Sequence, residues 1–339
     1  MMIRTFDGRY GVKRDLSKFV GEYQFEELQF VVGCGFEIRT PAALRCFAER
    51  TSAKIHLTVV DLLNRNDPSY RKARRLQMGN MNELERMASK RNCSFKRIKA
   101  NLYSKTLRAH VPVVESLIRT LRKFSGDFLL DISAMPRSIV FAALRLLWES
   151  KRVQNLFVVY TEDKGVGALE TQAAEFRSPK FLPNFHHERR FSKFAAWFPI
   201  LGGDPRPIQM IKSYMRFNDV YPVVGFPSTK PIETDEIVKL NRGIIGDNTE
   251  KLIFASMNDP FQLSIKLSTA IDELRSSFGG DIRTIISPHG SKPQSIGAFM
   301  TAMTRQTEVL YCQPLSYKSL PGSVGSSNLY WLKGIPYRD

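Results

Sequence analysis

The chain has 339 residues, of which 43% are hydrophobic, so it is long enough to bury one large core or two smaller ones. This composition excludes a disordered chain, a collagen-like chain and a small disulfide-framed domain. The 50 Lys and Arg against 33 Asp and Glu give a net charge of +17, which favours anionic partners such as nucleic acid, nucleotides or an acidic surface.

The positive charge is concentrated in the first part of the chain. Residues 1–200 hold 35 basic and 20 acidic residues, whereas residues 201–339 hold 15 and 13. Residues 51–100 alone hold 12 basic and 4 acidic residues. A surface that contacts a polyanion is therefore expected in the first half.

In chain order, the first half alternates between apolar, β-branched runs and amphipathic segments. The runs predict strands at 30–32, 54–62, 127–132 and 153–160. The amphipathic or charged segments predict helices at 42–49, 68–92, 113–124 and 139–148. Pro41 and Pro112 suit the first turns of two of these helices. This order is typical of a parallel sheet with helices on both faces.

The stretch 178–210 is rich in Pro, Gly and aromatic residues, and we interpret it as a domain boundary. The predicted division is a basic N-terminal domain over 1–180, a linker over 181–215 and a C-terminal domain over 216–339. The alternation then resumes, with strands at 221–226, 252–256, 282–287, 308–312 and 328–332 and helices at 265–278 and 294–303. The sequence thus predicts an α/β protein with two Rossmann-like three-layer halves and mainly parallel sheets.

Two segments resemble each other across the halves. FLLDISAMPRSIVFAALRLL is followed by VQNLFVVY, and RTIISPHGSKPQSIGAFMTAM is followed by TEVLYCQP. Each contains an apolar strand, a short turn with a small hydroxyl residue, a Pro and one cation (Arg137 or Lys292), then an amphipathic helix. The upstream segments FVVGCGFEIR and PVVGFPSTKP also look alike. We therefore predict an internal repeat.

A turn of this kind places free backbone N–H groups and the positive end of a helix dipole at the carboxyl edge of the sheet, where an anion binds. The alternative is that Ser, Gly and Pro only cap and turn the chain. Neither the Walker A motif nor the dinucleotide fingerprint is present. The predicted ligand-binding residues are Gly33, Gly35, Glu37, Arg39, Asp131, Ser133, Met135, Arg137, Ser287, His289, Gly290, Ser291, Lys292 and Gln294.

The strand, hydroxyl-containing turn, cation and helix of small and apolar residues resemble the ligand-binding motif of CARF domains, and their tandem occurrence resembles SAVED domains. Ser291 and Lys292 match the hydroxyl and cation of that motif. Ser133 and Arg137 match it less well, because Met135-Pro136 replaces the usual glycines. The resemblance implies a sensor of cyclic oligonucleotides or related nucleotides in prokaryotic antiviral defence. Because no effector segment follows, it also implies an effector protein as partner.

Two other functions stay open from the residues themselves. A nucleic-acid-binding component would use the basic segment, with phosphate contacts from Arg71, Lys72, Arg74, Arg75, Lys96 and Arg97; the alternative for this segment is a solvated surface. A nucleotide-processing enzyme would use Cys34 as nucleophile or His289 as acid or base, although no partner group is visible in the sequence. For Glu37 and Arg39 the alternative to ligand contact is a surface ion pair.

The remaining features favour a binding module over an enzyme. The four cysteines show neither C-x-x-C nor zinc-ligand spacing, so no metal or other cofactor is expected. No run of 18 apolar residues and no signal-peptide pattern occurs, and we expect a reduced, cytoplasmic protein without a membrane contact. Assembly into a homo-oligomer is left open.

Overall fold

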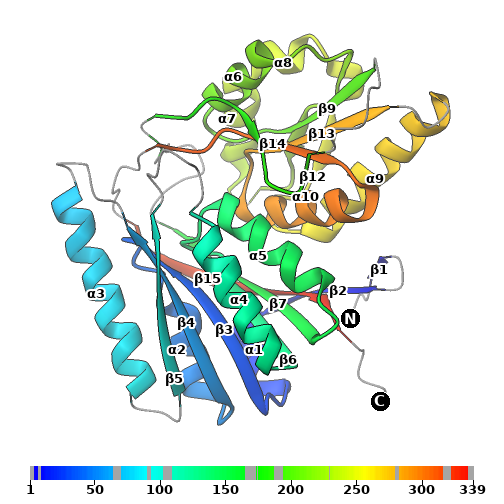
Figure 1. Cartoon of the computed structure of the whole chain (residues 1–339). Helices are drawn as coiled ribbons and strands as arrows, with labels where there is room; N and C mark the ends of the chain where they lie inside the picture. Colours follow the sequence, from blue (N-terminus) through cyan, green and yellow to red (C-terminus); the bar gives the residue numbers. More distant parts are fainter. Residues whose placement is uncertain are drawn as a thin grey trace. The chain divides into compact units, whose positions relative to one another are not determined.

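The computed structural model describes residues 4–6, 9–63, 70–89, 93–101, 109–164, 173, 175–186, 194–228, 230–278, 282–315 and 322–334. The chain forms two compact units, each shown in Figure 1. Unit 1 holds Met1–Val166 and Lys318–Asp339, and unit 2 holds Gly167–Tyr317. Unit 2 is thus inserted into the chain of unit 1, just before its last strand.

Unit 1 is built on an eight-stranded sheet in the order β1-β2-β15-β7-β6-β3-β4-β5. Five neighbouring strands, from β7 to β5, run parallel to one another. β15 pairs antiparallel with β7, and β2 pairs antiparallel with β15. Numbered by their appearance in the chain, the parallel strands have the order 3-2-1-4-5, which is the Rossmann order. The strands are β1 (Arg4–Phe6), β2 (Arg9–Asp15), β3 (Glu27–Cys34), β4 (Lys54–Leu63), β5 (Cys93–Asn101), β6 (Gly126–Asp131), β7 (Val153–Asp163) and β15 (Val324–Lys333).

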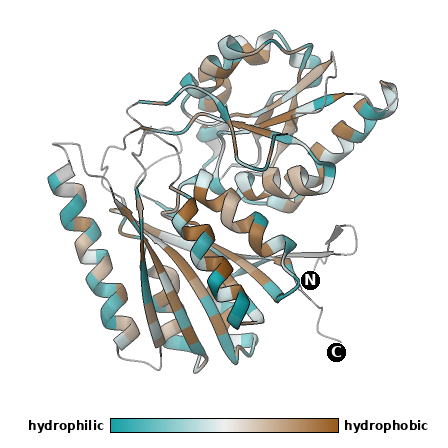
Figure 2. Cartoon of the chain, in the orientation of Figure 1, coloured by the Kyte–Doolittle hydropathy of each residue, from teal (hydrophilic) through white to brown (hydrophobic). Residues whose placement is uncertain are grey.

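Helices cover both faces of this sheet. α1, α2 and α3 bury one face in a core that includes Phe30, Phe47 and Phe157. α4 and α5 pack together on the other face, and the inner sides of the helices and strands are apolar (Figures 1 and 2). The helices are α1 (Leu16–Glu22), α2 (Ala42–Arg50), α3 (Tyr70–Ser89), α4 (Val111–Lys123) and α5 (Arg137–Glu149).

Unit 2 repeats this topology with seven strands. Its order β12-β11-β9-β13-β14-β8, with β10 beside β9, is again 3-2-1-4-5 for the parallel strands, and β8 is antiparallel at the edge. The strands are β8 (Lys180–Phe181), β9 (Ala195–Ile200), β10 (Asp219–Val220), β11 (Val223–Gly225), β12 (Ile253–Ala255), β13 (Arg283–Pro288) and β14 (Glu308–Tyr311). The helices are α6 (Arg206–Tyr214), α7 (Pro231–Leu240), α8 (Arg242–Gly246), the 3-10 turn η1 (Thr249–Lys251), α9 (Pro260–Ser277) and α10 (Lys292–Arg305).

The predicted α/β class with two Rossmann-like halves of mainly parallel sheet is confirmed. Each half has three layers: α1–α3 oppose α4 and α5 in unit 1, and α6–α8 oppose α9 and α10 in unit 2. No helix among the described residues is both long and apolar enough to cross a bilayer.

The predicted domain boundaries differ from those observed. The expected linker over 181–215 contains β8, β9 and α6, and all six residues of β9 are buried in the centre of the unit 2 sheet. Pro205 and Pro207 mark the start of α6, where proline is tolerated. Pro199 lies inside a central strand, a position that proline usually avoids. Proline content alone therefore gave a misleading boundary.

The last strand also belongs elsewhere than predicted. β15 pairs with β7 and β2, so it completes unit 1 and not the C-terminal half. The strand also begins earlier than predicted, at Val324 and not at residue 328. The sequence does not encode which strand an apolar run will pair with, and chain neighbours pair only in about two-thirds of cases.

The internal repeat is present, with one change in its alignment. β6-α5-β7 and β13-α10-β14 occupy the same fourth and fifth positions in the two sheets, as predicted. The first strand β3, however, corresponds to β9 and not to β11, which corresponds to β4. The matching segments are therefore VVGCGFEIRTP and FPILGGDPRP.

Candidate functional site

The predicted residues of unit 1 meet at the carboxyl ends of β3 and β6. These neighbouring strands lead to α2 and α5, which lie on opposite faces of the sheet, so this is the topological switch point where ligands bind in such folds. The two turns touch: a Cβ added to Gly33 would lie 3.1 Å from Cα of Met135. A side chain at position 33 would therefore crowd the turn after β6.

Three of the predicted ligand contacts prove to build this turn. Asp131 accepts a hydrogen bond from the backbone N–H of Ser133 (2.8 Å), and the Ser133 hydroxyl accepts one from the N–H of Thr161 at the end of β7 (2.8 Å). The Asp131 and Ser133 side chains are buried, as is Met135, which fills the space beside Gly33. They hold the turn and present no surface to a ligand.

Glu37 and Arg39 form an interior ion pair and not a surface pair, while their predicted contact with a ligand stays a prediction. Arg39 donates to the carboxylate of Glu37 (2.6 Å) and to the carbonyl of Thr161 (2.9 Å). The side chain of Arg39 is only 7% exposed, and that of Glu37 is 13% exposed. Burial alone would lower the pKa of Arg39, but the neighbouring Glu37 carboxylate raises it overall. The pair fixes the β3–α2 turn to the end of β7.

Unit 2 contains the same arrangement, an arginine paired with a carboxylate two residues earlier, in a more exposed form. Arg206 donates to Asp204 (2.7 Å), also two residues earlier, and to the carbonyl of Ala173 (2.8 Å). Each arginine lies over an aromatic ring, Tyr160 for Arg39 and Phe176 for Arg206. The Arg206 side chain is 47% exposed. The shared arrangement supports the alignment of β3 with β9.

The start of α5 is the part of the unit 1 turn that suits an anion. Its N-cap residue is Pro136, whose side chain cannot accept a hydrogen bond from the first turn. α2, on the other side of the switch point, has Pro41 as its N-cap. The half-buried Arg137 occupies the first position of α5. Two helix N-termini and one cation thus converge here, and Gly35 lies next to Ala134 of the same turn.

The corresponding turn of unit 2 is closed by its own side chains. Ser291 accepts from the N–H of Gln294 (3.1 Å), and the Gln294 side chain accepts from the N–H of Ser291 (3.0 Å), which is a complete capping box. The Ser291 hydroxyl donates to the carbonyl of Met257 (2.5 Å), and Pro293 has no N–H. The groups predicted to cradle an anion therefore satisfy the helix end itself.

The other predicted residues of unit 2 are also engaged in packing. The buried Ser287 accepts from the indole of Trp197 (2.8 Å). His289 stacks on Tyr311 with 4.9 Å between the ring centroids, and its Nε2 accepts from the N–H of Cys312 (3.4 Å). Gly290 is buried against Ile200 and Gln294. Among the predicted residues here, half-buried Lys292 carries a charge at the surface.

Cys34 does not have the surroundings of a nucleophile. It is buried, its thiol donates to the carbonyl of Gln77 (3.7 Å), and burial raises its pKa to about 12. Burial raises the pKa of Cys312 to about 12 as well. Reactive cysteines have a lowered pKa and an accessible sulfur.

We expect thiol labelling of the native protein to spare these two residues. Cys46 and Cys93 are half-buried and should react with iodoacetamide near neutral pH, whereas Cys34 and Cys312 should react only after unfolding. Because the pKa of Cys34 and of Cys312 is raised to about 12, far above neutrality, an increase in pH of one or two units should not change this order of labelling. Peptide mass spectrometry measures the order, and fast labelling of Cys34 would restore it as a candidate nucleophile.

The basic segment does not form one face. Arg71, Arg74 and Arg75 are exposed on α3, while Lys96 and Arg97 lie on β5, where successive side chains point to opposite faces. Arg97 points toward the α3 side and binds the buried Asp61 (2.7 Å). The side chain of Lys72 lies outside the described residues. The five predicted phosphate contacts that the structure describes are therefore divided between two sides of the sheet.

Sequence reasoning missed a buried polar network behind the β3–α2 turn. Asp61 accepts from Gln77 of α3 (2.8 Å), and Asn80 donates to the carbonyls of Gly35 (2.9 Å) and Glu37 (2.8 Å). A carboxylate within the apolar run of β4 was a visible signal for such a network. The sequence shows no such signal for Gln77 and Asn80, because it does not specify which residues pack against the helix that carries them.

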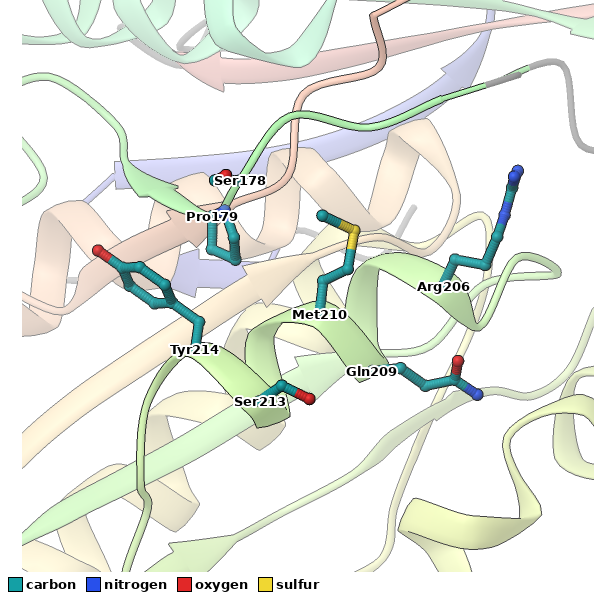
Figure 3. A pocket seen from close by; sticks show the side chains of 7 residues that line it. All are labelled: Ser178, Pro179, Arg206, Gln209, Met210, Ser213 and Tyr214. Carbon is teal, nitrogen blue, oxygen red and sulfur yellow. The ribbon is translucent and has the colours of Figure 1, made fainter.

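The structure also has two surface pockets, one of which is lined by Arg206 from the start of α6. In unit 2 an open pocket of about 590 Å³ lies along α6, lined by Arg206, Met210 and Tyr214 with Pro179 opposite (Figure 3). In unit 1 a groove of about 450 Å³ lies between α4 and α5. Neither pocket is lined by a residue predicted as ligand-binding.

Comparison with known proteins gives no functional assignment. No protein-family model matches the chain, and no curated protein matches it significantly. The solved structures that match include PA1789 from Pseudomonas aeruginosa PAO1, described as functionally unknown. It is 12% identical, the match covers 85% of this chain and 92% of that chain, and the TM-score is 0.23. A similarity this low carries no argument about function.

Proposed function

We propose that the protein binds a nucleotide at the carboxyl edge of the unit 1 sheet, through the first turn of α5 and Arg137. The observation that supports this most is the pair of proline-capped helices, α2 and α5, at the switch point of a sheet with Rossmann order. No N-cap side chain accepts a hydrogen bond from the first turn of either helix. The N–H of Ala42 donates to the carbonyl of Arg39, and that of Ile139 donates to the carbonyl of Pro136. A phosphate would accept from other N–H groups of these turns.

In this proposal the two units have different roles. The capping box of α10 argues against phosphate contacts from Ser291 and Gln294, so Lys292 would add at most a peripheral charge. The ion pair of Arg39 and the Asp131–Ser133 contact keep the unit 1 turns in place, so the site needs little reorganisation when a ligand binds.

The biological role we propose is that of a regulatory sensor. The resemblance of the turn and helix to CARF and SAVED domains favours a cyclic oligonucleotide ligand, a role in prokaryotic antiviral defence and an effector protein as partner. The buried, protonated state of the Cys34 thiol favours a binding module over an enzyme that uses this residue.

Replacing Arg137 with Ala should weaken nucleotide binding by about ten- to a hundredfold, since a hydrogen bond to a charged group contributes about 1.5–3 kcal/mol. Arg145→Ala is the matched control: it removes a cation from the same helix, but one that pairs with Glu149 two turns further along. Calorimetric titration with cyclic and linear oligoadenylates and with ATP measures both. Binding by none of these probes, or equal losses in the two variants, would contradict the proposal.

A further inference from the structure

A cluster of cations lies at the edge of the unit 1 sheet, away from the proposed nucleotide site. We call it the α4 strip: the exposed side chains of Lys96, Arg119, Arg122, Lys123 and Arg152. They come from β5, from the second half of α4 and from the turn between α5 and β7. Arg119, Arg122 and Lys123 have the helical spacing that places them on one face of α4.

The fold brings Lys96 to α4 and not to α3. In β5 it shares a face with the buried Ile98 and Ala100, whereas Arg97 faces the opposite way and binds Asp61. α4 packs against β5. Burial, together with the positive charges of Arg119 and Lys123, lowers the pKa of Lys96, so the three cations lie close enough to repel one another.

The strip differs from other basic residues of unit 1 because its cations have no ion-pair partner among the described residues; its acidic neighbour Glu149 pairs with Arg145 instead. Lys54 and Arg97 form ion pairs with Glu27 and Asp61, and Arg145 pairs with Glu149. Within the described part of the chain, no carboxylate forms an ion pair with any of the five cations of the strip. No ion pair within the described part of the chain therefore offsets the repulsion among them, and a polyanion would relieve it.

A groove continues the strip between α4 and α5. Its volume is about 450 Å³, and Arg122 and Arg152 line it together with one carboxylate, Glu149. The rest of the lining is Ile118, Leu121, Leu146 and Ser150. Charge complementarity therefore favours a partner with several negative charges. No aromatic side chain lines this groove, so it offers phosphate contacts without a platform for stacking bases.

We infer that the α4 strip binds the phosphate backbone of double-stranded nucleic acid. This site is separate from the proposed nucleotide site, because it uses the opposite ends and other residues of the helices and does not include Arg137. Binding of this type is independent of sequence and weakens steeply with salt, because each neutralised phosphate releases counterions.

The test is fluorescence anisotropy of a labelled DNA duplex of about 20 base pairs, titrated with the full chain between roughly 50 and 200 mM salt. The variant R119Q/R122Q/K123Q should bind about thirtyfold more weakly at the lower salt, and its slope of log affinity against log salt should fall by about 2 to 3. The charge-matched control R71Q/R74Q/R75Q removes three exposed cations from α3 and should bind within about threefold of the unmodified chain.

A second variant separates charge from folding. R119K/R122K/K123R keeps all three charges and should bind as the unmodified chain does, and circular dichroism checks that each variant is folded. Unchanged binding by the α4 variant, an equal loss in the α3 variant, or failure of the charge-conserving variant would each overturn the inference. So would tighter binding to vesicles containing phosphatidylserine than to the duplex at the same salt.

Discussion

Arg39→Met is expected to destabilise unit 1 by about 3–5 kcal/mol, because it leaves the Glu37 carboxylate in the interior without its partner. The same change removes the hydrogen bond to the carbonyl of Thr161 and loosens the end of β7 from the β3–α2 turn. Hydrogen exchange of the β3 and β7 amides measures the loss, since it reports each unit separately.

Arg206, the equivalent arginine of unit 2, provides the control for this substitution. Arg206→Met removes an ion pair of the same spacing, but the guanidinium is 47% exposed, so solvent already screens the pair and we expect a loss of at most about 1 kcal/mol in β9 and β13. Equal losses in the two units would show that burial is not what makes the Arg39 pair important.

Gly202→Ala is the second substitution with a large expected effect. A Cβ at this position would lie 2.3 Å from the carbonyl oxygen of His289, so the turns after β9 and β13 would have to separate. We expect unit 2 to lose about 1–3 kcal/mol, the usual cost of overpacking.

The control for this substitution is Gly243→Ala in α8. No atom lies within 4 Å of its added Cβ, and alanine is the better helix former, so the change should stabilise unit 2 by up to about 1 kcal/mol. Urea denaturation compares the two variants. A neutral Gly202→Ala would mean that the two turns are not held in contact.

The sequence predicted the regular elements well where their periodicity was strong. The helices at 42–49 and 139–148 and the strands at 54–62 and 308–312 agree with the structure to within a few residues. The errors arose from non-local pairing. Nothing in the apolar run of β15 indicates that it returns to unit 1 across an inserted unit.

The alignment of the repeat failed for a related reason. PVVGF of β11 looks like FVVGC of β3, but similar strands recur wherever a sheet is buried on both faces. The informative match lay in the turns, where Glu37 and Arg39 correspond to Asp204 and Arg206. Ion-pairing residues two positions apart near a proline at the start of a helix are more specific than an apolar run.

The position of the ligand site stays a prediction, whereas the structure does show how the side chains of its turns are used. The turns at 33–39 and 131–137 do meet at the sheet edge. Residues such as Ser and Gln at a helix start serve an anion or the helix itself, and only the hydrogen bonds distinguish these uses. For α10 the signal was readable, because Ser291 and Gln294 have the S-x-x-Q spacing of a capping box.

The location of the bound nucleotide tests the central claim most directly. Amide hydrogen exchange of the full chain, with and without saturating cyclic tetra-adenylate, reports on both helix starts in one experiment. We predict added protection in residues 133–140 and 35–43 and little change in residues 289–296. Protection confined to residues 289–296 would contradict the assignment to unit 1, and no protection in either segment would contradict nucleotide binding at these turns.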